Sequence, residues 1–185
     1  ALSYLNLVLE GSEKVLKTAD TGEAIRHGLD IVIIGSPNTG KSTILNALSK
    51  RDAAIVTPTA GTTRDIVSIN MILTGIPVRL SDTAGIRDTS NEIEAEGIDR
   101  ALKLSKKADI LIHVIDLTED NSDNNIKSQI SDGDIVVYNK VDKYQKQTML
   151  KRGISSNEIK ISALKEKDID DLRALIEKII LEKYT

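Results

Sequence analysis

The chain reads Gly35-Ser36-Pro37-Asn38-Thr39-Gly40-Lys41-Ser42 directly after the apolar run Leu29–Ile34. A glycine-rich turn between a strand and a helix points several backbone N–H groups inward and forms an anion site at the helix N-terminus. Lys41 is suited to reach the β- and γ-phosphates of a nucleoside triphosphate, and the Ser42 hydroxyl to complete the shell of a Mg²⁺ ion. We therefore expect a phosphate-binding loop, which by itself does not distinguish ATP from GTP. Its nucleotide contacts are expected from Asn38, Thr39, Gly40, Lys41, Ser42 and Thr43.

The composition is that of a single globular domain. The chain has 185 residues, of which 40% are hydrophobic and 29% charged, as in ordinary soluble proteins. Its formal net charge of −3 argues against a free-standing nucleic-acid binder, which needs a clustered basic surface. The absence of cysteine excludes a disulfide, a zinc-thiolate site and a thiol nucleophile from this sequence. Residues 1–9 lack the features of a signal peptide and no apolar stretch is long enough for a membrane span, so we expect a cytoplasmic protein without a membrane partner.

Short apolar runs alternate with helical patterns from Leu29 onward, which indicates an α/β fold with a mostly parallel six-stranded sheet flanked by helices. The ligand of such a sheet lies at the carboxyl ends of its strands, where the glycine-rich loop falls. The predicted strands are Leu29–Ile34, Ile66–Leu73, Val78–Leu80, Ile110–Ile115, Ile135–Tyr138 and a shorter Glu158–Ile161. The predicted helices are Lys41–Lys50, Glu92–Lys106, Asn124–Ile130 and Asp168–Lys183, the last with Asp168 as its N-cap.

Residues 1–27 differ from the rest of the chain because their leucines recur at a loosely helical spacing among polar residues. A helix with one apolar stripe needs a partner surface. We therefore expect residues 1–27 to be a helical stub of a neighbouring domain, and residues 28–185 to form the nucleotide-binding domain. The two histidines, His27 and His113, fall in no motif and are interpreted as structural.

Two loop segments are suited to the γ-phosphate and to Mg²⁺. Gly61-Thr62-Thr63-Arg64-Asp65 offers the Thr63 hydroxyl to the metal and its N–H to the γ-phosphate, and such a loop is ordered only while that phosphate is present. Asp82-Thr83-Ala84-Gly85 follows a predicted strand pair. Asp82 is expected to hold a Mg²⁺-bound water, and the Gly85 N–H to meet the γ-phosphate where no side chain fits.

Two further segments select the base. Asn139-Lys140-Val141-Asp142 and Ser162-Ala163-Leu164 each follow a predicted strand. The Asp142 carboxylate can accept hydrogen bonds from N1–H and the 2-amino group of guanine, a pair of donors that adenine lacks, and the Ala163 N–H can meet guanine O6. A site built on paired polar groups rejects an unmatched base strongly. The sequence therefore predicts GTP and GDP as ligands, with base contacts from Asn139, Lys140, Asp142, Ser162, Ala163 and Leu164.

These motifs together resemble the translation-factor-related GTPases and, closely, the tRNA-modification GTPase family MnmE, also called TrmE. The match covers roughly residues 29–183. Its specific parts are the segments 82–94 (Asp-Thr-Ala-Gly-Ile-Arg-Asp-Thr-Ser-Asn-Glu-Ile-Glu), 97–101 (Gly-Ile-Asp-Arg-Ala) and 53–57 (Ala-Ala-Ile-Val-Thr). The resemblance implies a Ras-like, P-loop GTPase domain that in this family is inserted into a helical domain, so the sequence looks like an isolated G domain.

The position after Gly85 is informative about hydrolysis. Ras-like enzymes have a glutamine there that orients the attacking water, whereas this chain has Ile86. The residue type and spacing alone favour a solvent-facing helix carboxylate for Glu94, but the resemblance implies that Glu94 polarises the water instead. The resemblance also implies that a K⁺ ion replaces an arginine finger. The residues that match the K⁺ contacts of the family are Asn38, then Thr57 and Thr59 through their carbonyls, and Thr62 through its hydroxyl.

The resemblance further implies GTP hydrolysis with Mg²⁺, stimulated by K⁺ and by transient face-to-face pairing of two G domains. The family works with a flavin-dependent partner protein to modify the wobble uridine, U34, of certain tRNAs. Two alternatives stay open. One is a ribosome-assembly GTPase of the Gly-Thr-Thr-Arg-Asp class. The other is a GTP-dependent binding switch whose hydrolysis is incidental.

Overall fold

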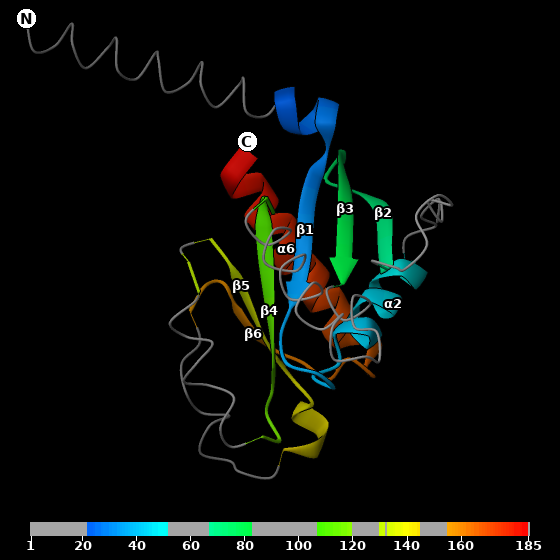
Figure 1. Cartoon of the computed structure of the whole chain (residues 1–185), viewed down its shortest axis with the longest axis vertical. Helices are drawn as coiled ribbons and strands as arrows, with labels where there is room; N and C mark the ends of the chain where they lie inside the picture. The colour runs from blue at the N-terminus through cyan, green and yellow to red at the C-terminus, as the bar shows by residue number, and fades with distance from the viewer. Residues whose placement is uncertain are drawn as a thin grey trace, which may run out of the picture.

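A computed structural model of the chain describes residues 22–51, 67–82, 107–119, 130–131, 133–144 and 155–184 (Figure 1). The predicted helix Glu92–Lys106 lies outside these residues. So does most of the predicted helix Asn124–Ile130, whose last residue is not helical. Of the predicted stub at residues 1–27, the described part, residues 22–27, is helical.

The described core is a six-stranded sheet, as the sequence predicts. Its strands follow the order β2-β3-β1-β4-β5-β6. All neighbouring pairs are parallel except the antiparallel pair β2 and β3. The strands are β1 (Leu29–Ile34), β2 (Val67–Leu73), β3 (Ile76–Asp82), β4 (Ile110–Asp116), β5 (Ile135–Asn139) and β6 (Glu158–Lys160).

The antiparallel pair is a hairpin closed by two residues. Thr74 and Gly75 both have positive φ, 51° and 83°, the backbone of a type I′ turn, whose twist matches that of the flanking strands. β3 extends beyond the predicted Val78–Leu80 at both ends because it pairs with β2 on one side and with β1 on the other. As a result Asp82 is the last residue of a central strand rather than the first residue of a loop.

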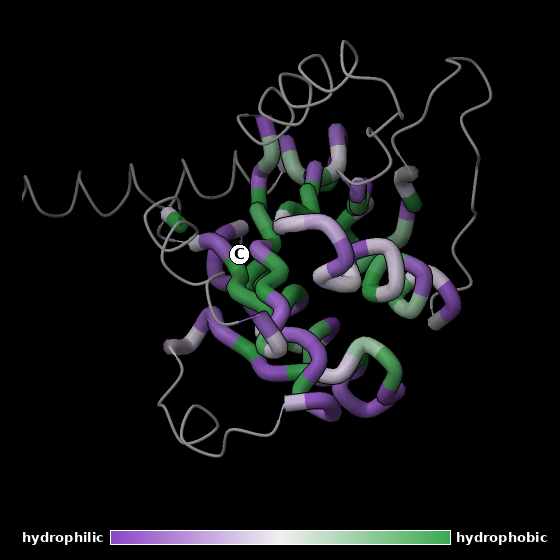
Figure 2. Tube along the Cα trace, turned by 60° about the horizontal axis from the view of Figure 1, so that its bottom comes forward, coloured by the Kyte–Doolittle hydropathy of each residue, from purple (hydrophilic) through white to green (hydrophobic). Residues whose placement is uncertain are grey.

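Two helices pack on one face of the sheet, α2 (Lys41–Arg51) and α6 (Glu166–Tyr184). Figure 2 shows hydrophobic positions gathered in the interior along the strands, with hydrophilic ones toward the periphery. This arrangement is the expected consequence of an apolar stripe on each helix facing the sheet. The core includes Ile31 and Ile33 of β1, Ile112 and Val114 of β4, Ile44, Leu45 and Leu48 of α2, and Ile169, Leu172, Ile176 and Ile180 of α6.

The opposite face of the sheet is buried as well, as parallel sheets require. Val32, Ile115 and Val136 are each at most 2% exposed. His113 on the same face is buried, and its Nε2 lies 2.9 Å from Oδ2 of Asp134. This internal pair agrees with the structural role expected for His113.

The start of α6 corrects one prediction. The helix begins at Glu166 rather than after Asp168, so Asp168 is not its N-cap. Instead the Asp168 carboxylate accepts a hydrogen bond from the Ser162 N–H (2.7 Å). The acidic side chain in the first turn of the helix thus ties the helix to the loop that precedes it.

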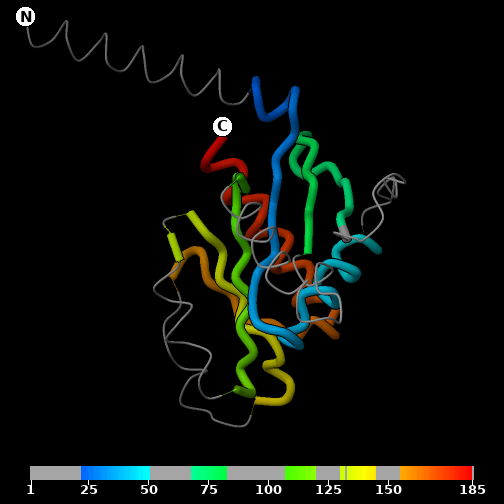
Figure 3. The backbone as a smooth tube through the Cα atoms, viewed as in Figure 1, coloured from blue at the N-terminus to red at the C-terminus, as the bar shows by residue number. Residues whose placement is uncertain are grey.

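The first and last described segments of the chain both lie near the amino-terminal ends of the parallel strands, away from their carboxyl ends (Figure 3). There the Asp30 N–H donates to Asp109 (2.8 Å), and the Asp30 carboxylate accepts two hydrogen bonds from Arg79. The Lys183 ammonium donates to the Asp109 carbonyl (2.6 Å), which fastens the end of α6 to the start of β4. This network stabilises the end of the sheet that carries none of the predicted nucleotide residues.

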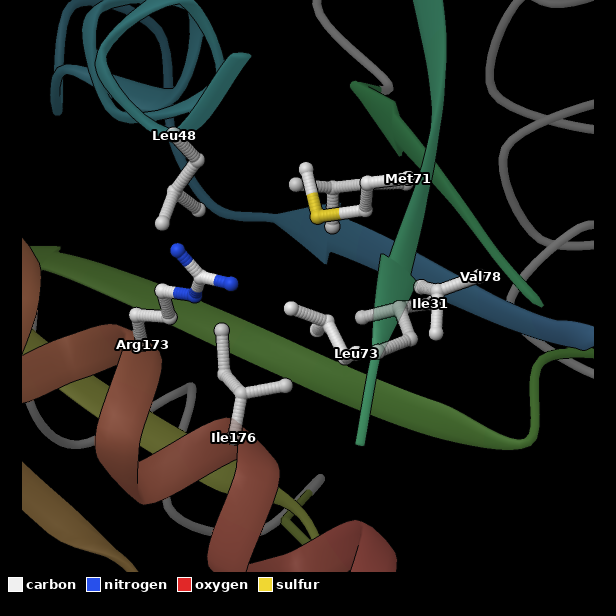
Figure 4. A pocket seen from close by; sticks show the side chains of 8 residues that line it. Ile31, Leu48, Met71, Leu73, Val78, Arg173 and Ile176 are labelled. Atoms are coloured by element: carbon white, nitrogen blue, oxygen red, sulfur yellow. The ribbon is translucent and has the colours of Figure 1, made fainter. Parts of the chain in front are cut away.

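A small cavity remains between the sheet and the two helices. It has a volume of about 10 Å³ and is apolar except for Arg173. Figure 4 shows the Arg173 guanidinium extending from α6 toward Leu48 of α2, with Met71 and Leu73 across the gap. A space of that size is at the lower limit for a single water, so the cavity is a packing feature and no ligand site.

Candidate nucleotide-binding site

The structure gathers the predicted nucleotide residues within the described ranges at the carboxyl edge of the sheet. The glycine-rich loop follows β1, Asp82 ends β3, and Asn139 ends β5. Ser162, Ala163 and Leu164 follow shortly after β6. Because parallel strands end at the same edge, segments more than a hundred residues apart in sequence meet there.

The loop after β1 depends on its glycines. Gly35, Asn38 and Gly40 all have positive φ, at 150°, 62° and 98°, a conformation that favours glycine. A Cβ on Gly35 would lie under 3.0 Å from the Val114 carbonyl oxygen, and a Cβ on Gly40 would lie equally close to Asn139 Nδ2. The loop is thus packed directly against β4 and against the predicted base-recognition segment.

Lys41 closes the loop from the first turn of α2. Its ammonium donates to the carbonyl oxygens of Gly35 (3.0 Å) and Ser36 (2.7 Å), and the residue is 4% exposed. The Thr39 hydroxyl also donates to the Ser36 carbonyl (3.0 Å). These bonds hold a positive charge over the loop at the N-terminus of a helix, which is the arrangement that binds phosphates.

Two predicted magnesium residues are in contact. The Ser42 hydroxyl of α2 donates to Asp82 Oδ2 at the end of β3 over 2.6 Å. A hydroxyl and a carboxylate held together beside a phosphate site fit the hard oxygen ligands that Mg²⁺ takes. No group of three or more acidic or histidine side chains suited to a metal occurs in the described part of the chain. Mg²⁺ would therefore draw its other ligands from phosphates, waters or the segment containing Thr63.

Asn139 joins three segments of the site. Its Nδ2 donates to the Thr39 carbonyl (2.8 Å), its Oδ1 accepts from the Ala163 N–H (3.0 Å), and the residue is 2% exposed. The structure thus gives Asn139 a positioning role between the phosphate loop and the predicted base loop. Direct contacts of Asn139 with the nucleotide, and of the Ala163 N–H with guanine O6, stay predictions.

Lys140 lies in the turn between β5 and a short 3₁₀ helix, η2 (Val141–Lys143). Its ammonium pairs with Asp116 Oδ2, and Asp116 Oδ1 accepts from the Thr118 N–H (2.9 Å) and hydroxyl (2.6 Å). Asp116 was not predicted from the sequence. The signal that points to it is a carboxylate at the end of a strand that is apolar apart from His113.

Asp142 in η2 lies beside Ser162. The Ser162 hydroxyl is buried and reaches no partner at ordinary hydrogen-bond geometry. Its approach to the Asp142 carboxylate is nevertheless the largest influence that lowers the pKa of that group, while burial acts in the opposite direction. Asp142 is therefore a carboxylate at neutral pH, as recognition of the two guanine donors requires. Leu164, at 75% exposed, presents an apolar surface next to this pair.

The other predicted site residues lie outside the described residues: Thr57, Thr59, Thr62, Thr63, Gly85 and Glu94. Their roles stay predictions. Within the described ranges, no helix is both long and apolar enough to span a bilayer.

Comparisons with known protein families agree with this geometry. The model of the 50S ribosome-binding GTPase family matches residues 30–151. Among curated proteins, the tRNA modification GTPase MnmE of Aquifex aeolicus is 40% identical over 92% of this chain, and that of Maricaulis maris is 43% identical over 89%. The matches cover 39% and 36% of those proteins. The chain therefore spans less than half the length of these relatives and matches only their G domain.

Solved structures give the same fold. A variant of Era from Aquifex aeolicus bound to GDP·AlF4⁻ is 29% identical, with a TM-score of 0.58 over 82% of this chain and 56% of that one. A GTP-binding protein from Sulfolobus solfataricus in complex with GDP has a TM-score of 0.60 over 98% of this chain and 61% of that one. At 21% identity the second likeness supports the fold alone.

Proposed function

The chain belongs to the 50S ribosome-binding GTPase family and is a GTP-hydrolysing enzyme, and we propose that it serves as the G domain of a tRNA modification GTPase of the MnmE kind. In this proposal hydrolysis requires Mg²⁺ and is stimulated by K⁺ through transient pairing of two G domains. The full protein acts in the cytoplasm with a flavin-dependent partner on the wobble uridine of tRNA. The identity of 36–45% to MnmE relatives carries the tRNA assignment.

The arrangement at the carboxyl edge of the sheet carries the nucleotide assignment. Lys41 and the loop amides bind the β- and γ-phosphates, and Asp142 accepts the two guanine donors. Ser42, and Asp82 through a water, would hold Mg²⁺, which would supply charge neutralisation for the departing diphosphate. The protein's own residues orient the triphosphate, and positioning of this kind supplies most of the catalysis of phosphoryl transfer.

The K⁺ proposal draws on the position of Asn38. This residue has positive φ at the tip of the phosphate loop and is exposed, so its side chain is accessible to an ion beside the phosphates. Carbonyls of Thr57 and Thr59 and the hydroxyl of Thr62 would complete the site. A cation there would offset charge that develops between the β- and γ-phosphates, and Ile86 leaves the water to be positioned by Glu94.

We expect GTP turnover in K⁺ to exceed turnover in Na⁺ at matched ionic strength by about tenfold, because a well-placed cation stabilises the transition state by an amount of that order. Steady-state phosphate release at saturating protein measures the effect. Asn38→Ala should lose the K⁺ response while it keeps GDP binding in Na⁺. Equal rates in the two salts would refute K⁺-dependent pairing.

Glu94→Ala should lower kcat by roughly 100-fold with GTP binding intact, since removal of a group that orients or deprotonates water costs at least this much. Glu92→Ala and Glu96→Ala are matched controls from the same acidic stretch, and they should retain parental turnover. Single-turnover hydrolysis is the measurement. A near-parental rate for Glu94→Ala would return this residue to a solvent-facing role.

A second candidate function is ribosome assembly, which the name of the matching family, 50S ribosome-binding GTPase, favours. Era, a relative at 29% identity, has been solved in complex with nucleotides of 16S ribosomal RNA. We rank this candidate second because the identity to MnmE proteins is higher, at 36–45%. GTP-dependent co-sedimentation of the full-length protein with ribosomal subunits, without capture of a flavoprotein, would reverse the order. A binding switch is the third candidate, and it predicts turnover indifferent to both K⁺ and Glu94.

A further inference from the structure

Asp116 is an acidic residue buried at the edge of the nucleotide site. It is the last residue of β4 and is 2% exposed. A buried carboxylate is costly unless it is paired and hydrogen-bonded. Asp116 has such partners in the Thr118 N–H, the Thr118 hydroxyl and the Lys140 ammonium. None of the sequence motifs includes it.

Lys140 is held in a conformation that a lysine seldom adopts. Its φ of 65° and ψ of 34° place it in the left-handed region, which is uncommon for residues other than glycine, asparagine and aspartate. The turn at Lys140 redirects the chain from β5 into η2. The Val141 N–H then donates to the Ile161 carbonyl (3.2 Å) and the Lys143 N–H to the Lys140 carbonyl (3.0 Å). Asp142 is two residues beyond the turn, so its position depends on the turn.

We infer that Asp116 is a positioning residue for base selection: by holding the Lys140 ammonium it fixes the turn that presents Asp142 to guanine. The contact joins the end of β4 to the turn after β5, and these two strands are adjacent in the sheet, with Asp116 opposite Asn139. Asp116 itself acts through Lys140 and touches no nucleotide. This inference rests on the guanine site proposed above.

The charge state of Asp116 agrees with this role. Burial acts to raise its pKa, but the hydrogen bonds from Lys140 and Thr118 outweigh burial and leave the pKa below its usual value. The group is therefore an anion at neutral pH, able to attract the ammonium through a poorly solvated environment. An asparagine has nearly the same shape but lacks the charge, so it tests the ion pair with little change in packing.

The test compares GDP with inosine diphosphate, which lacks the 2-amino group that Asp142 recognises. Asp116→Asn should weaken GDP binding by about tenfold, the order of a charge-assisted hydrogen bond, and weaken inosine diphosphate binding less, so that the ratio of the two affinities falls severalfold. Isothermal titration measures both. The matched control is Asp134→Asn. It removes the carboxylate that pairs with His113 just before β5, and it should leave the ratio of the two affinities at its parental value.

A double variant tests whether Asp116 acts through Lys140. Lys140→Gly keeps the left-handed turn but removes the ammonium, so Asp116→Asn added to it should change the ratio less than twofold, because coupled residues are not additive. Lys140→Met should lower the ratio of GDP to inosine diphosphate affinity as Asp116→Asn does. It therefore tests the inference if Asp116→Asn does not fold. Equal losses for both nucleotides, or additive effects in the double variant, would overturn the inference. A parental ratio near one would instead refute the guanine site itself.

Discussion

We expect Asp142→Asn to change the preferred base from guanine to xanthine, with a shift of at least about 1,000-fold in the ratio of GTP to xanthosine triphosphate affinity. In the proposed site the carboxylate of Asp142 accepts from N1–H and the 2-amino group of guanine. An asparagine still accepts from N1–H through its oxygen, but its amide nitrogen is a donor and faces the guanine amino group. Xanthine has a carbonyl oxygen at that position, so the amide donates to it and both bonds are restored.

The size of the effect follows from the surroundings of Asp142. It is carried by the short helix η2, whose start is fixed by the bond from the Val141 N–H to the Ile161 carbonyl. The nearby Ser162 hydroxyl lowers the pKa of Asp142, so the parental group is fully ionised at neutral pH. A wrong pairing leaves a donor facing a donor against the bound base, and a site built on paired polar groups rejects an unmatched base strongly.

Competition of both triphosphates against a fluorescent GDP measures the ratio, with phosphate release as a second readout. Asp171→Asn serves as the matched control, since it removes one negative charge from an exposed position of α6 and should leave base preference unchanged. Unchanged GTP affinity in Asp142→Asn would show that this carboxylate does not contact the base.

The sheet was predictable because most of its strands are short apolar runs that can be recognised from the local sequence. The apolar runs of β1, β4 and β5 are bounded by polar or glycine residues, and in each of these three strands the prediction lies within one residue of the observed end. β3 was predicted too short because Pro77 precedes the apolar run and the polar Ser81 and Asp82 follow it. The strand includes these residues because it pairs with β1 on one side and with β2 on the other.

The site residues were predictable only where a short sequence motif specifies the residue type that the chemistry of the ligand needs. Ser42 contacts Asp82, and Lys41 bonds to the glycine-rich loop beside them, while their roles toward phosphate and Mg²⁺ stay predictions. Asn139 was assigned to the base, yet both ends of its amide bond to other loops of the protein, a tertiary role that no spacing encodes. Asp116 was missed for the same reason, since its partner Lys140 is 24 residues away.

Asp168 shows how tertiary contacts change a local signal. Aspartate is favoured at an N-cap, but the carboxylate of Asp168 accepts a hydrogen bond from the Ser162 N–H instead. The helix therefore begins two residues earlier, at Glu166. The result serves the site, because the bond fastens the start of α6 to the loop that carries Ala163 and Leu164.

Gly35→Ala should destabilise the fold by about 4 kcal/mol, the sum of backbone strain and overpacking. The φ of 150° at Gly35 disfavours any residue with a Cβ, and the added carbon would lie under 3.0 Å from the carbonyl oxygen of Val114. Val114 is a fully buried residue of central strand β4, and its oxygen belongs to the backbone, so no side-chain rotation relieves the clash. The loop and the strand must separate, which also moves Lys41 away from the phosphates.

Urea unfolding measures the loss, and Gly75→Ala separates its two causes. Gly75 also has positive φ, 83°, but a Cβ there meets nothing within 4 Å, so this variant reports backbone strain alone and should lose about 1 kcal/mol. The difference between the two variants is the contribution of the contact between the phosphate loop and β4. If Gly35→Ala lost no more stability than Gly75→Ala, the contact between the phosphate loop and Val114 would contribute nothing to the stability of the fold.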